Sequence, residues 1–345
     1  MVRRCFIWAL LGCAWTGTAL GQNDELVVRQ QSARFESARN RGALKESRRL
    51  LAADATCYDL PGRDSRSLLY DLALAAQRRN KSGKARLEPV RVISREVRVQ
   101  GTVAIVTELL GAAEDVPRGQ KVMPRRRTIV WNKVAGKWKL YHLHTSGYTL
   151  WERAIQNFET ADEQQAPTAN GVVFVGSSSI VGWKTLADDF PQAKTLRRGF
   201  GGSDIIDSVA YAHRIVTPYQ PRRIALYAGD NDIARGKTPE RVFEDYKLFV
   251  ATVHAALPDA TIGFIAIKPS LARWEMWPQM AAANQQIQQY AKSHPQLDYL
   301  DIATPMLGDD HMPQSQLFAQ DGLHLSPAGY AVWTKAMTAW VHAAP

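Results

Sequence analysis

Residues 171–183, GVVFVGSSSIVGW, join an apolar run to a glycine and three consecutive serines. A short apolar run that ends at turn residues is typical of a buried β-strand. Further apolar runs follow in RIALYA, TIGFIAI and LDYLDI, and helical patterns lie around residues 203–215, 239–256, 278–293 and 327–342. Because near-continuous apolar strands that alternate with helices are typical of a parallel sheet covered on both faces, we predict an α/β fold for this half of the chain.

Polar loops that contain glycine or serine follow these strands. Serines 177–179 follow the first run, GFGGSD (199–204) follows a weaker apolar segment around KTLRR, and AGDND (228–232) follows RIALY. Near the end, DGLH (321–324) precedes the last helical pattern, which starts at SPAGY. In an open parallel sheet the ligand crevice lies beyond the carboxyl ends of the strands. We therefore expect these four loops to meet at one edge of the sheet.

The four loops carry a family resemblance. Across roughly residues 150–343 the chain resembles the SGNH hydrolases, also called GDSL esterases. Two positions depart from that family's pattern, since Ser177 stands where aspartate is usual and Arg197 precedes the second block where asparagine is common. The residues that match the four family blocks are Gly176 and Ser178, then Gly202, then Gly229, Asn231 and Asp232, and finally Asp321 and His324.

The resemblance implies a flavodoxin-like parallel sheet with helices on both faces over residues 149–345 and a serine hydrolase mechanism. Ser178 is then the nucleophile, His324 the general base, and Asp321 the group that orients the imidazole. The backbone N–H groups of Ser178 and Gly202 and the side-chain amide of Asn231 would stabilise the oxyanion. This chemistry needs no cofactor and no metal ion. The chain also lacks the thiolate and histidine spacing of a zinc site and the glycine-lysine loop of a nucleotide enzyme.

The sequence also suggests which kind of ester the protein would hydrolyse. No long apolar lid is evident, which favours a short acyl group, acetyl first, and Trp274 and Trp277 are spaced to flank a sugar ring. The same two tryptophans could instead pack the start of the next helix. A lysophospholipase or thioesterase, and a non-catalytic ligand-binding protein, stay open as alternatives.

The first half of the chain has a different pattern of apolar residues. A helical pattern covers residues 25–53 and a shorter one residues 67–79, and four segments with a period of two follow between residues 90 and 146. Residues 22–148 resemble the nuclear-transport-factor-like (SnoaL-type) family, which implies a smaller α+β, cone-shaped domain. Similarity to that fold does not indicate a particular function. A homodimer is expected by analogy with the family alone. The polar residues to inspect in its pocket are Asp54, Tyr58, Asp59, His142 and His144.

The N-terminus is typical of an export signal. Two arginines precede an apolar stretch, and small residues follow before Gln22, so residues 1–21 are predicted to be a removed signal peptide. The apolar stretch is short for a membrane span. LLGC (10–13) also resembles a lipobox, in which Cys13 would be lipidated. We expect an exported protein, periplasmic or secreted, that acts on a small acyl ester, with an acetylated carbohydrate as one form.

Charge is unevenly divided along the chain. Residues 22–150 hold 25 Lys and Arg against 13 Asp and Glu, a net +12, whereas residues 151–345 have a net charge of −4. The arginines of the first half are scattered through helix and strand patterns rather than clustered with aromatic residues. This spacing favours solvated faces over a nucleic-acid site, so no nucleic-acid partner is expected.

Overall fold

The chain forms two compact units in the computed structural model. The structure describes residues 16–59, 66–67, 90–112, 116 and 121–343. One unit holds the residues up to Leu110 and also Arg125–Gly147, and the other holds Gly111–Pro124 and Tyr148–Pro345. Within the described residues, no helix combines the length and the hydropathy that a membrane crossing requires.

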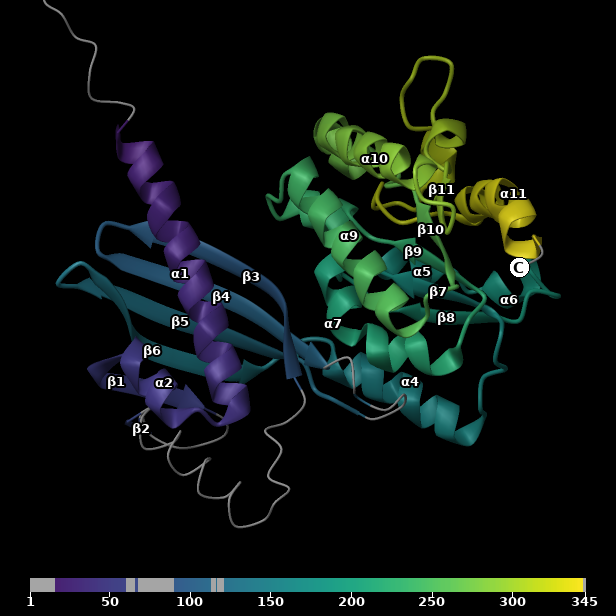
Figure 1. Ribbon diagram of the computed structural model, residues 1–345. Helices are drawn as coiled ribbons and strands as arrows, with labels where there is room; N and C mark the ends of the chain where they lie inside the picture. The colour runs from purple at the N-terminus through teal and green to yellow at the C-terminus, as the bar shows by residue number, and fades with distance from the viewer. Residues whose placement is uncertain (1–15, 60–65, 68–89, 113–115, 117–120, 344–345) are drawn as a thin grey trace, which may run out of the picture. The chain divides into compact units, whose positions relative to one another are not determined.

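The first unit is a helix packed on a curved mixed sheet. The sheet has the strand order β2-β1-β6-β5-β4-β3, and α1 lies across it (Figure 1). Val28 and Phe35 of α1 are fully buried in the same core as Ala104, Val106 and Trp131 of the strands. The elements of this unit are α1 (Thr16–Arg41), α2 (Leu44–Leu50), β1 (Leu51–Asp59), β2 (Arg66–Ser67), β3 (Val90–Gln100), β4 (Val103–Ala112), β5 (Arg125–Val134) and β6 (Lys137–Gly147).

The start of this unit differs from the sequence prediction. A single helical region was expected over residues 25–53, but α1 ends before Gly42, which has a φ of +69°, and the strand β1 begins at Leu51. The strand forms because β1 pairs in parallel with β6, for example Cys57 with Leu143. A partner so distant in the chain leaves no mark on local periodicity. The helix predicted over residues 67–79 and the turn before it lie almost wholly outside the described residues.

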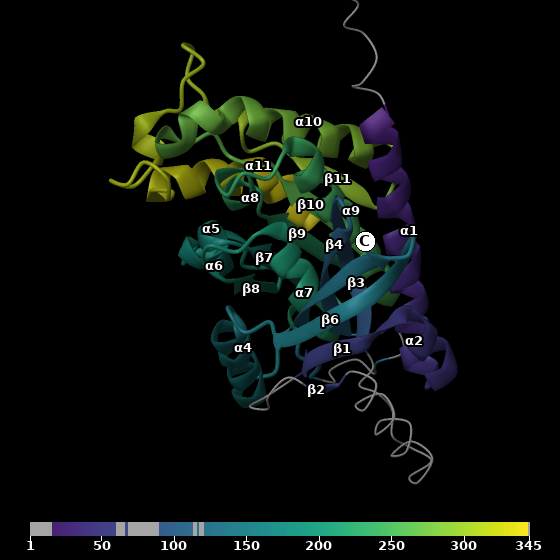
Figure 2. The same cartoon turned by 90° about the vertical axis from the view of Figure 1, so that its left-hand side faces the viewer.

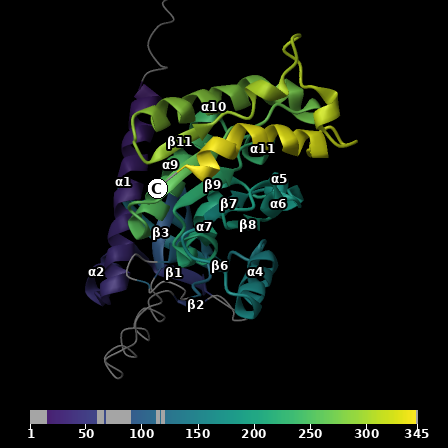
Figure 3. The ribbon, with the colours of Figure 1, turned by 90° about the vertical axis from the view of Figure 1, so that its right-hand side faces the viewer.

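The second unit has the predicted α/β fold. Its five-stranded sheet has the order β11-β10-β9-β7-β8 with every pairing parallel, which is the flavodoxin-like arrangement. Helices lie on both sides of these strands (Figure 2 and Figure 3). The strands are β7 (Val172–Gly176), β8 (Thr195–Gly199), β9 (Arg223–Tyr227), β10 (Thr261–Ile265) and β11 (Leu297–Leu300).

One helix contributes much of the core on one face of this sheet. Trp333, Met337 and Val341 of α11 are fully buried and pack in one cluster with Phe174 of β7 and Tyr227 of β9. The helices are α4 (Glu152–Gln164), α5 (Ser178–Gly182), α6 (Leu186–Asp189), α7 (Ile205–Ile215), α8 (Asp230–Ala234), α9 (Pro239–Ala256), α10 (Trp277–Lys292) and α11 (Pro327–His342). Short 3-10 turns are η1 (Thr217–Tyr219), η2 (Leu271–Met276), η3 (Thr304–Met306) and η4 (Ser315–Leu317).

The second unit also includes a piece of chain from between two strands of the first. Val122, from the connection between β4 and β5, is buried, and its carbonyl oxygen lies 2.8 Å from Nε2 of His213 on α7. The backbone N–H of Tyr148 donates to the carbonyl of Pro124 at 2.8 Å. Burial lowers the pKa of His213 to about 4, although the Val122 carbonyl acts against that shift.

We expect His213 to make stability depend on pH. Unfolded histidine takes up a proton below about pH 6.5, whereas folded His213 does so only near pH 4. Between these values the unfolded state binds more protons, so the free energy of unfolding falls as the pH is lowered through that window. Urea denaturation of the wild type and of His213→Gln at several pH values measures this effect. The wild type should lose stability more steeply, by up to about 1.4 kcal/mol per pH unit; equal slopes would contradict the assignment.

Candidate active site

The candidate site lies where the order of the sheet reverses. β7 has β8 on one side and β9 on the other, and ligands bind at such a switch point. At the end of β7, Gly176 has a φ of +141°, and a Cβ there would lie 1.8 Å from the carbonyl oxygen of Tyr227 in β9. Only glycine permits this approach. The next N–H, that of Ser177, donates to the same Tyr227 carbonyl at 3.0 Å. The end of β9 therefore fixes the start of the serine loop.

The three serines are in different environments. Oγ of Ser178, the first residue of α5, lies 3.0 Å from Nε2 of His324. Ser177 and Ser179 are buried; the Ser177 hydroxyl has no hydrogen-bond partner within the described part of the chain, and the Ser179 hydroxyl interacts with that of Tyr227. Ser178 is the serine whose hydroxyl faces an imidazole.

Asp321 holds the other side of that imidazole. Its Oδ2 lies 2.5 Å from Nδ1 of His324, and its Oδ1 accepts from the backbone N–H groups of Leu323 and His324, each at 2.9 Å. The hydrogen bond from the His324 side chain, followed by those from the two backbone groups, holds the pKa of the Asp321 carboxyl well below its usual value. The two side chains remain 43% and 50% exposed, so this pair lies at an open surface.

The loop after β8 lies beside the serine. A Cβ on Gly201 would lie 3.9 Å from Cβ of Ser178, and Gly202 has a φ of +76°, in the left-handed region that favours glycine. Asn231, in the segment after β9 that turns into the short helix α8 (the Asn231 loop), donates from Nδ2 to the carbonyl of Ser203 at 3.1 Å. The structure thus brings the Gly202 loop next to Ser178 and joins Asn231 to that loop.

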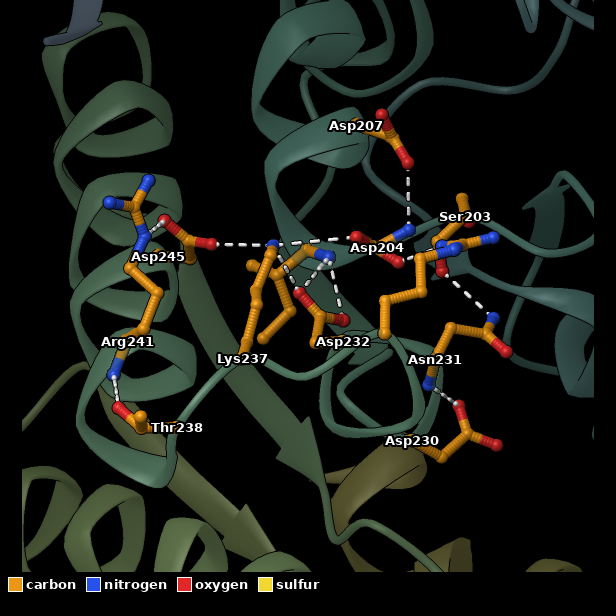
Figure 4. Close-up of polar contacts among 12 residues, drawn as sticks. Ser203, Asp204, Asp207, Asp230, Asn231, Asp232, Lys237, Thr238, Arg241 and Asp245 are labelled. Atoms are coloured by element: carbon orange, nitrogen blue, oxygen red, sulfur yellow. Dashed lines mark hydrogen bonds and ion pairs between the residues drawn. The ribbon is translucent and has the colours of Figure 1, made fainter. Parts of the chain in front are cut away.

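A buried network of charges ties the same two loops together (Figure 4). Nζ of Lys237 lies 2.7 Å from Asp232, 2.8 Å from Asp245 and 3.4 Å from Asp204. Asp232 also accepts from the backbone N–H of Ile205, at the start of α7. The three carboxylates therefore share the single ammonium group of Lys237. This shared contact holds the Gly202 loop against the Asn231 loop.

The network shifts the pKa values of two of its members, Asp232 and Lys237, away from their usual values. Burial raises the pKa of Asp232 to about 7, although Lys237 acts against that shift. Burial opposes the charge of Lys237 as well, but Asp232 and Asp245 outweigh it and hold the pKa of Lys237 above its usual value. Asp204 is also bonded by Arg235, whose other nitrogen donates to the carbonyl of Gly202 at 2.7 Å. Sequence reasoning identified Asp232 through its motif but missed Lys237 and Arg235, because nothing in their local pattern marks them.

The two tryptophans do not flank a sugar-sized gap. The rings of Trp274 and Trp277 are nearly parallel, at an angle of 13°, with their centroids 6.0 Å apart. They therefore face each other, and Trp277, the first residue of α10, packs against the core. The alternative that these residues pack the start of a helix is the one that the structure supports.

Of the residues singled out in the first unit, the three whose side chains the structure describes do not gather in a buried pocket. Asp54 is exposed, and the side chains of Tyr58 and Asp59 lie outside the described residues. His142 and His144 do share one face of β6, but the residues that follow each of them, Leu143 and Thr145, are the buried ones in this part of the strand, so the histidines point to the other face. Nδ1 of His142 lies 2.8 Å from Oγ1 of Thr56. Among the side chains that the structure describes, no three of His, Cys, Asp or Glu are grouped to hold a metal ion.

Three solved structures are similar to parts of this chain. A protein from Streptococcus pneumonia that is described as a platelet activating factor is 18% identical, with a TM-score of 0.50, over 55% of this chain and 92% of that one. A GDSL-like lipase from Bacteroides thetaiotaomicron is 20% identical, with a TM-score of 0.48, over 54% and 96%. An NTF2-like protein from Pseudomonas putida is 17% identical, with a TM-score of 0.30, over 36% and 87%.

The family follows from a different comparison. A search of curated proteins found no match. The model of the GDSL-like lipase/acylhydrolase family, in contrast, matches residues 143–332, which is more than half of the chain. This stretch contains the serine, histidine and aspartate described above and all five strands of the parallel sheet. The chain therefore belongs to the GDSL-like lipase/acylhydrolase family.

Proposed function

We propose that this protein is a serine esterase that removes short acyl groups, acetyl first, from alcohols. One observation carries the proposal: Oγ of Ser178 lies 3.0 Å from Nε2 of His324, whose Nδ1 lies 2.5 Å from Oδ2 of Asp321. A nucleophile, a base and an orienting carboxylate in this order are what acyl transfer requires. Membership of an acylhydrolase family agrees with that reaction.

The reaction proceeds in two halves. His324 accepts the proton of Ser178 as Oγ attacks the ester carbonyl, and it returns that proton to the departing alcohol, which leaves an acyl group on Ser178. Water then attacks the acyl group, His324 accepts a proton from the water, and this proton returns to Ser178 as the carboxylic acid is released. Asp321 stays ionised throughout because its pKa is lowered, so it stabilises the imidazolium.

The oxyanion is stabilised by donors from three loops. They are the backbone N–H of Ser178, at the first position of α5, the backbone N–H of Gly202, and the side-chain amide of Asn231. One N–H of the Asn231 amide donates to Ser203, which leaves the second for the substrate. Each such donor contributes typically about 10²- to 10³-fold in kcat.

The exposure of the site favours a short acyl group. The His324 and Asp321 side chains are about half exposed, and charged residues, Arg235 among them, line the Gly202 loop. Each methylene that an acyl chain buries adds about 0.8 kcal/mol to its binding, and an open polar rim offers little apolar surface for that gain. An ester of a bulky alcohol, such as an acetylated saccharide, can approach such a rim.

A chain-length series tests this assignment. We expect kcat/KM for p-nitrophenyl esters to be highest for acetate and to fall as the acyl chain lengthens, together with release of acetate from acetylated xylan. A rate that rises steeply with chain length would favour a lysophospholipase or thioesterase instead. Labelling of the purified protein by a fluorophosphonate tests for an activated serine, and failure to label would favour a non-catalytic binding protein.

The remaining proposals concern the first unit and the location of the protein. Its helix packed on a curved sheet agrees with a nuclear-transport-factor-like cone, for which a homodimer is the associated proposal. The cationic and apolar start of the chain supports export, with lipidation at Cys13 as the alternative. Mass spectrometry of the protein recovered from a bacterial periplasm, with cleavage expected before Gln22, tests the export signal.

A further inference from the structure

Arg273 contacts the amide that is proposed to hold the oxyanion. It lies in η2, after β10, and its side chain is 18% exposed. Its Nη2 donates to Oδ1 of Asn231 at 3.0 Å, and its Nη1 lies 3.3 Å from Oδ2 of Asp230. The guanidinium thus binds the first two residues of α8, the short helix that follows β9. Neither the strand pattern nor the family blocks singled out this residue.

These contacts set the direction in which the Asn231 amide points. A guanidinium has donors only, so the atom turned toward it must be the amide oxygen. The amide nitrogen then faces the carbonyl of Ser203, to which it donates at 3.1 Å. If the amide turned over, its NH₂ would face the donors of Arg273 and its oxygen would face the Ser203 carbonyl. Two hydrogen bonds would be lost and two repulsive contacts made at a buried site, which is a large cost.

The guanidinium of Arg273 is itself held in place by Asp230, which also pairs with Lys268. Asp230 is buried, and burial opposes its ionisation, but Lys268 and then Arg273 outweigh that effect and hold its pKa below the usual value. Nζ of the buried Lys268 lies 2.9 Å from Asp230 and 2.8 Å from the hydroxyl of Tyr227. Oδ1 of Asp230 accepts from the backbone N–H of Asn231 at 3.0 Å. The Asn231 backbone and side chain are therefore bound to one charged group of side chains.

The same segment also reaches the loop that carries the base. The backbone N–H of Ala272 donates to the carbonyl of Gly322 at 3.0 Å, and Gly322 lies between Asp321 and His324 in the chain. Neighbouring residues of η2 thus contact the amide loop and the imidazole loop. A shift of this segment would disturb both halves of the site together.

We propose that Arg273 is a positioning residue that fixes the side-chain amide of Asn231 with its N–H toward the oxyanion. This inference rests on the proposed esterase function and names a residue that acts through Asn231 rather than on the substrate. Because the oxyanion forms in the transition state, loss of the positioning lowers kcat and leaves KM nearly unchanged.

A double-mutant cycle between Arg273 and Asn231 tests the proposal. We expect Arg273→Met and Asn231→Ala each to lower kcat for p-nitrophenyl acetate by about 10²-fold. The double variant should stay within about threefold of Asn231→Ala alone, because Arg273 has no effect once the amide is absent. Losses that multiply to about 10⁴-fold or more would show that Arg273 acts independently of Asn231 and would overturn the proposal.

Two further variants separate positioning from folding. Arg273→Lys keeps a positive charge beside Asp230, and whatever loss of kcat it causes should also vanish in the Asn231→Ala background. The matched control is Arg198→Met, which removes a guanidinium that is paired with Asp162 and bonded to Tyr219, at a side chain that is 6% exposed. It should lower the urea midpoint but leave kcat per folded molecule within about twofold. A loss in this control equal to that of Arg273→Met would overturn the proposal.

A measurement without substrate separates this inference from the function on which it rests. In protein labelled with ¹⁵N-asparagine, the side-chain NH₂ signals absent from Asn231→Ala belong to Asn231. Hydrogen exchange of these protons should be faster in Arg273→Met than in the wild type and unchanged in Arg198→Met. Unchanged exchange in Arg273→Met would refute the positioning role whether or not the protein hydrolyses esters. If exchange is faster in Arg273→Met but the wild type hydrolyses no ester, only the proposed function is refuted.

Discussion

Replacement of Ser178 by alanine is expected to lower kcat for p-nitrophenyl acetate by about 10⁴-fold or more, with little change in KM. The variant lacks the oxygen that attacks the carbonyl, and Nε2 of His324, 3.0 Å from that oxygen in the wild type, has no proton to accept from it. What remains is the effect of binding and of the oxyanion donors. Stopped-flow and steady-state release of p-nitrophenol measure the loss, and a fluorophosphonate should no longer label the protein.

The neighbouring serines supply the matched controls for that result. Ser179→Ala removes a buried hydroxyl that interacts with Tyr227 rather than with His324, and Ser177→Ala removes one that has no hydrogen-bond partner within the described residues. Removal of such a group costs little and can stabilise the fold. Both variants should therefore keep kcat within a small factor of the wild type. Activity retained by Ser178→Ala, or lost equally in all three variants, would rule out Ser178 as the nucleophile.

The second large effect is expected for Asp321→Asn, with a loss of about 10³- to 10⁴-fold in kcat. An asparagine amide can turn its N–H toward Nδ1 of His324, which stabilises the tautomer that cannot accept the serine proton at Nε2. It also carries no charge to stabilise the imidazolium. Oδ1 can still accept from the backbone N–H groups of Leu323 and His324, so the turn itself should be kept.

The pH dependence of this variant adds a second criterion. Since the pKa of Asp321 lies well below its usual value, the carboxylate is present at every pH above the ordinary value of about 3.9 and is lost only as the pH falls through the lower folded value. The loss caused by Asp321→Asn should therefore be similar from pH 5 to pH 9. Asp310→Asn is the control, because Asp310 makes a similar bond to the backbone N–H of Met312 in an exposed turn. A loss below about tenfold in Asp321→Asn would contradict the assigned role.

The strands of the parallel sheet and the loops at their carboxyl ends could be predicted from the sequence because both depend on local signals, whereas the order of the strands came from the family resemblance. Buried parallel strands appear as apolar runs, and the loops at their carboxyl ends carry glycine where the chain must turn sharply, as at Gly176. The parallel order then brings the loops to one edge. The choice of Ser178 among three serines came from the family resemblance, and the distance to His324 is the contact that this choice requires.

The residues that sequence reasoning missed act through contacts that depend on the folded chain. Arg273, Lys268 and Lys237 look like ordinary basic residues in loops, and only the fold places them against Asp230, Asn231 and Asp232. The strand β1 was missed for a similar reason, since its pairing with β6 is distant in sequence. The tryptophan pair was misleading because a spacing alone does not say whether two rings face a gap or each other.

The short connection between β4 and β5 has a consequence for recombination and for protein engineering. The polypeptide passes between the two units three times, because Gly111–Pro124 belongs to the second unit and Arg125–Gly147 to the first. An exchange of genetic modules with a single crossover near Tyr148 would leave His213 without the carbonyl of Val122. A transplanted hydrolase unit therefore has to carry both Gly111–Pro124 and Tyr148–Pro345. A fusion that supplies only the later stretch would lack the packing contacts that the earlier stretch makes within the same unit.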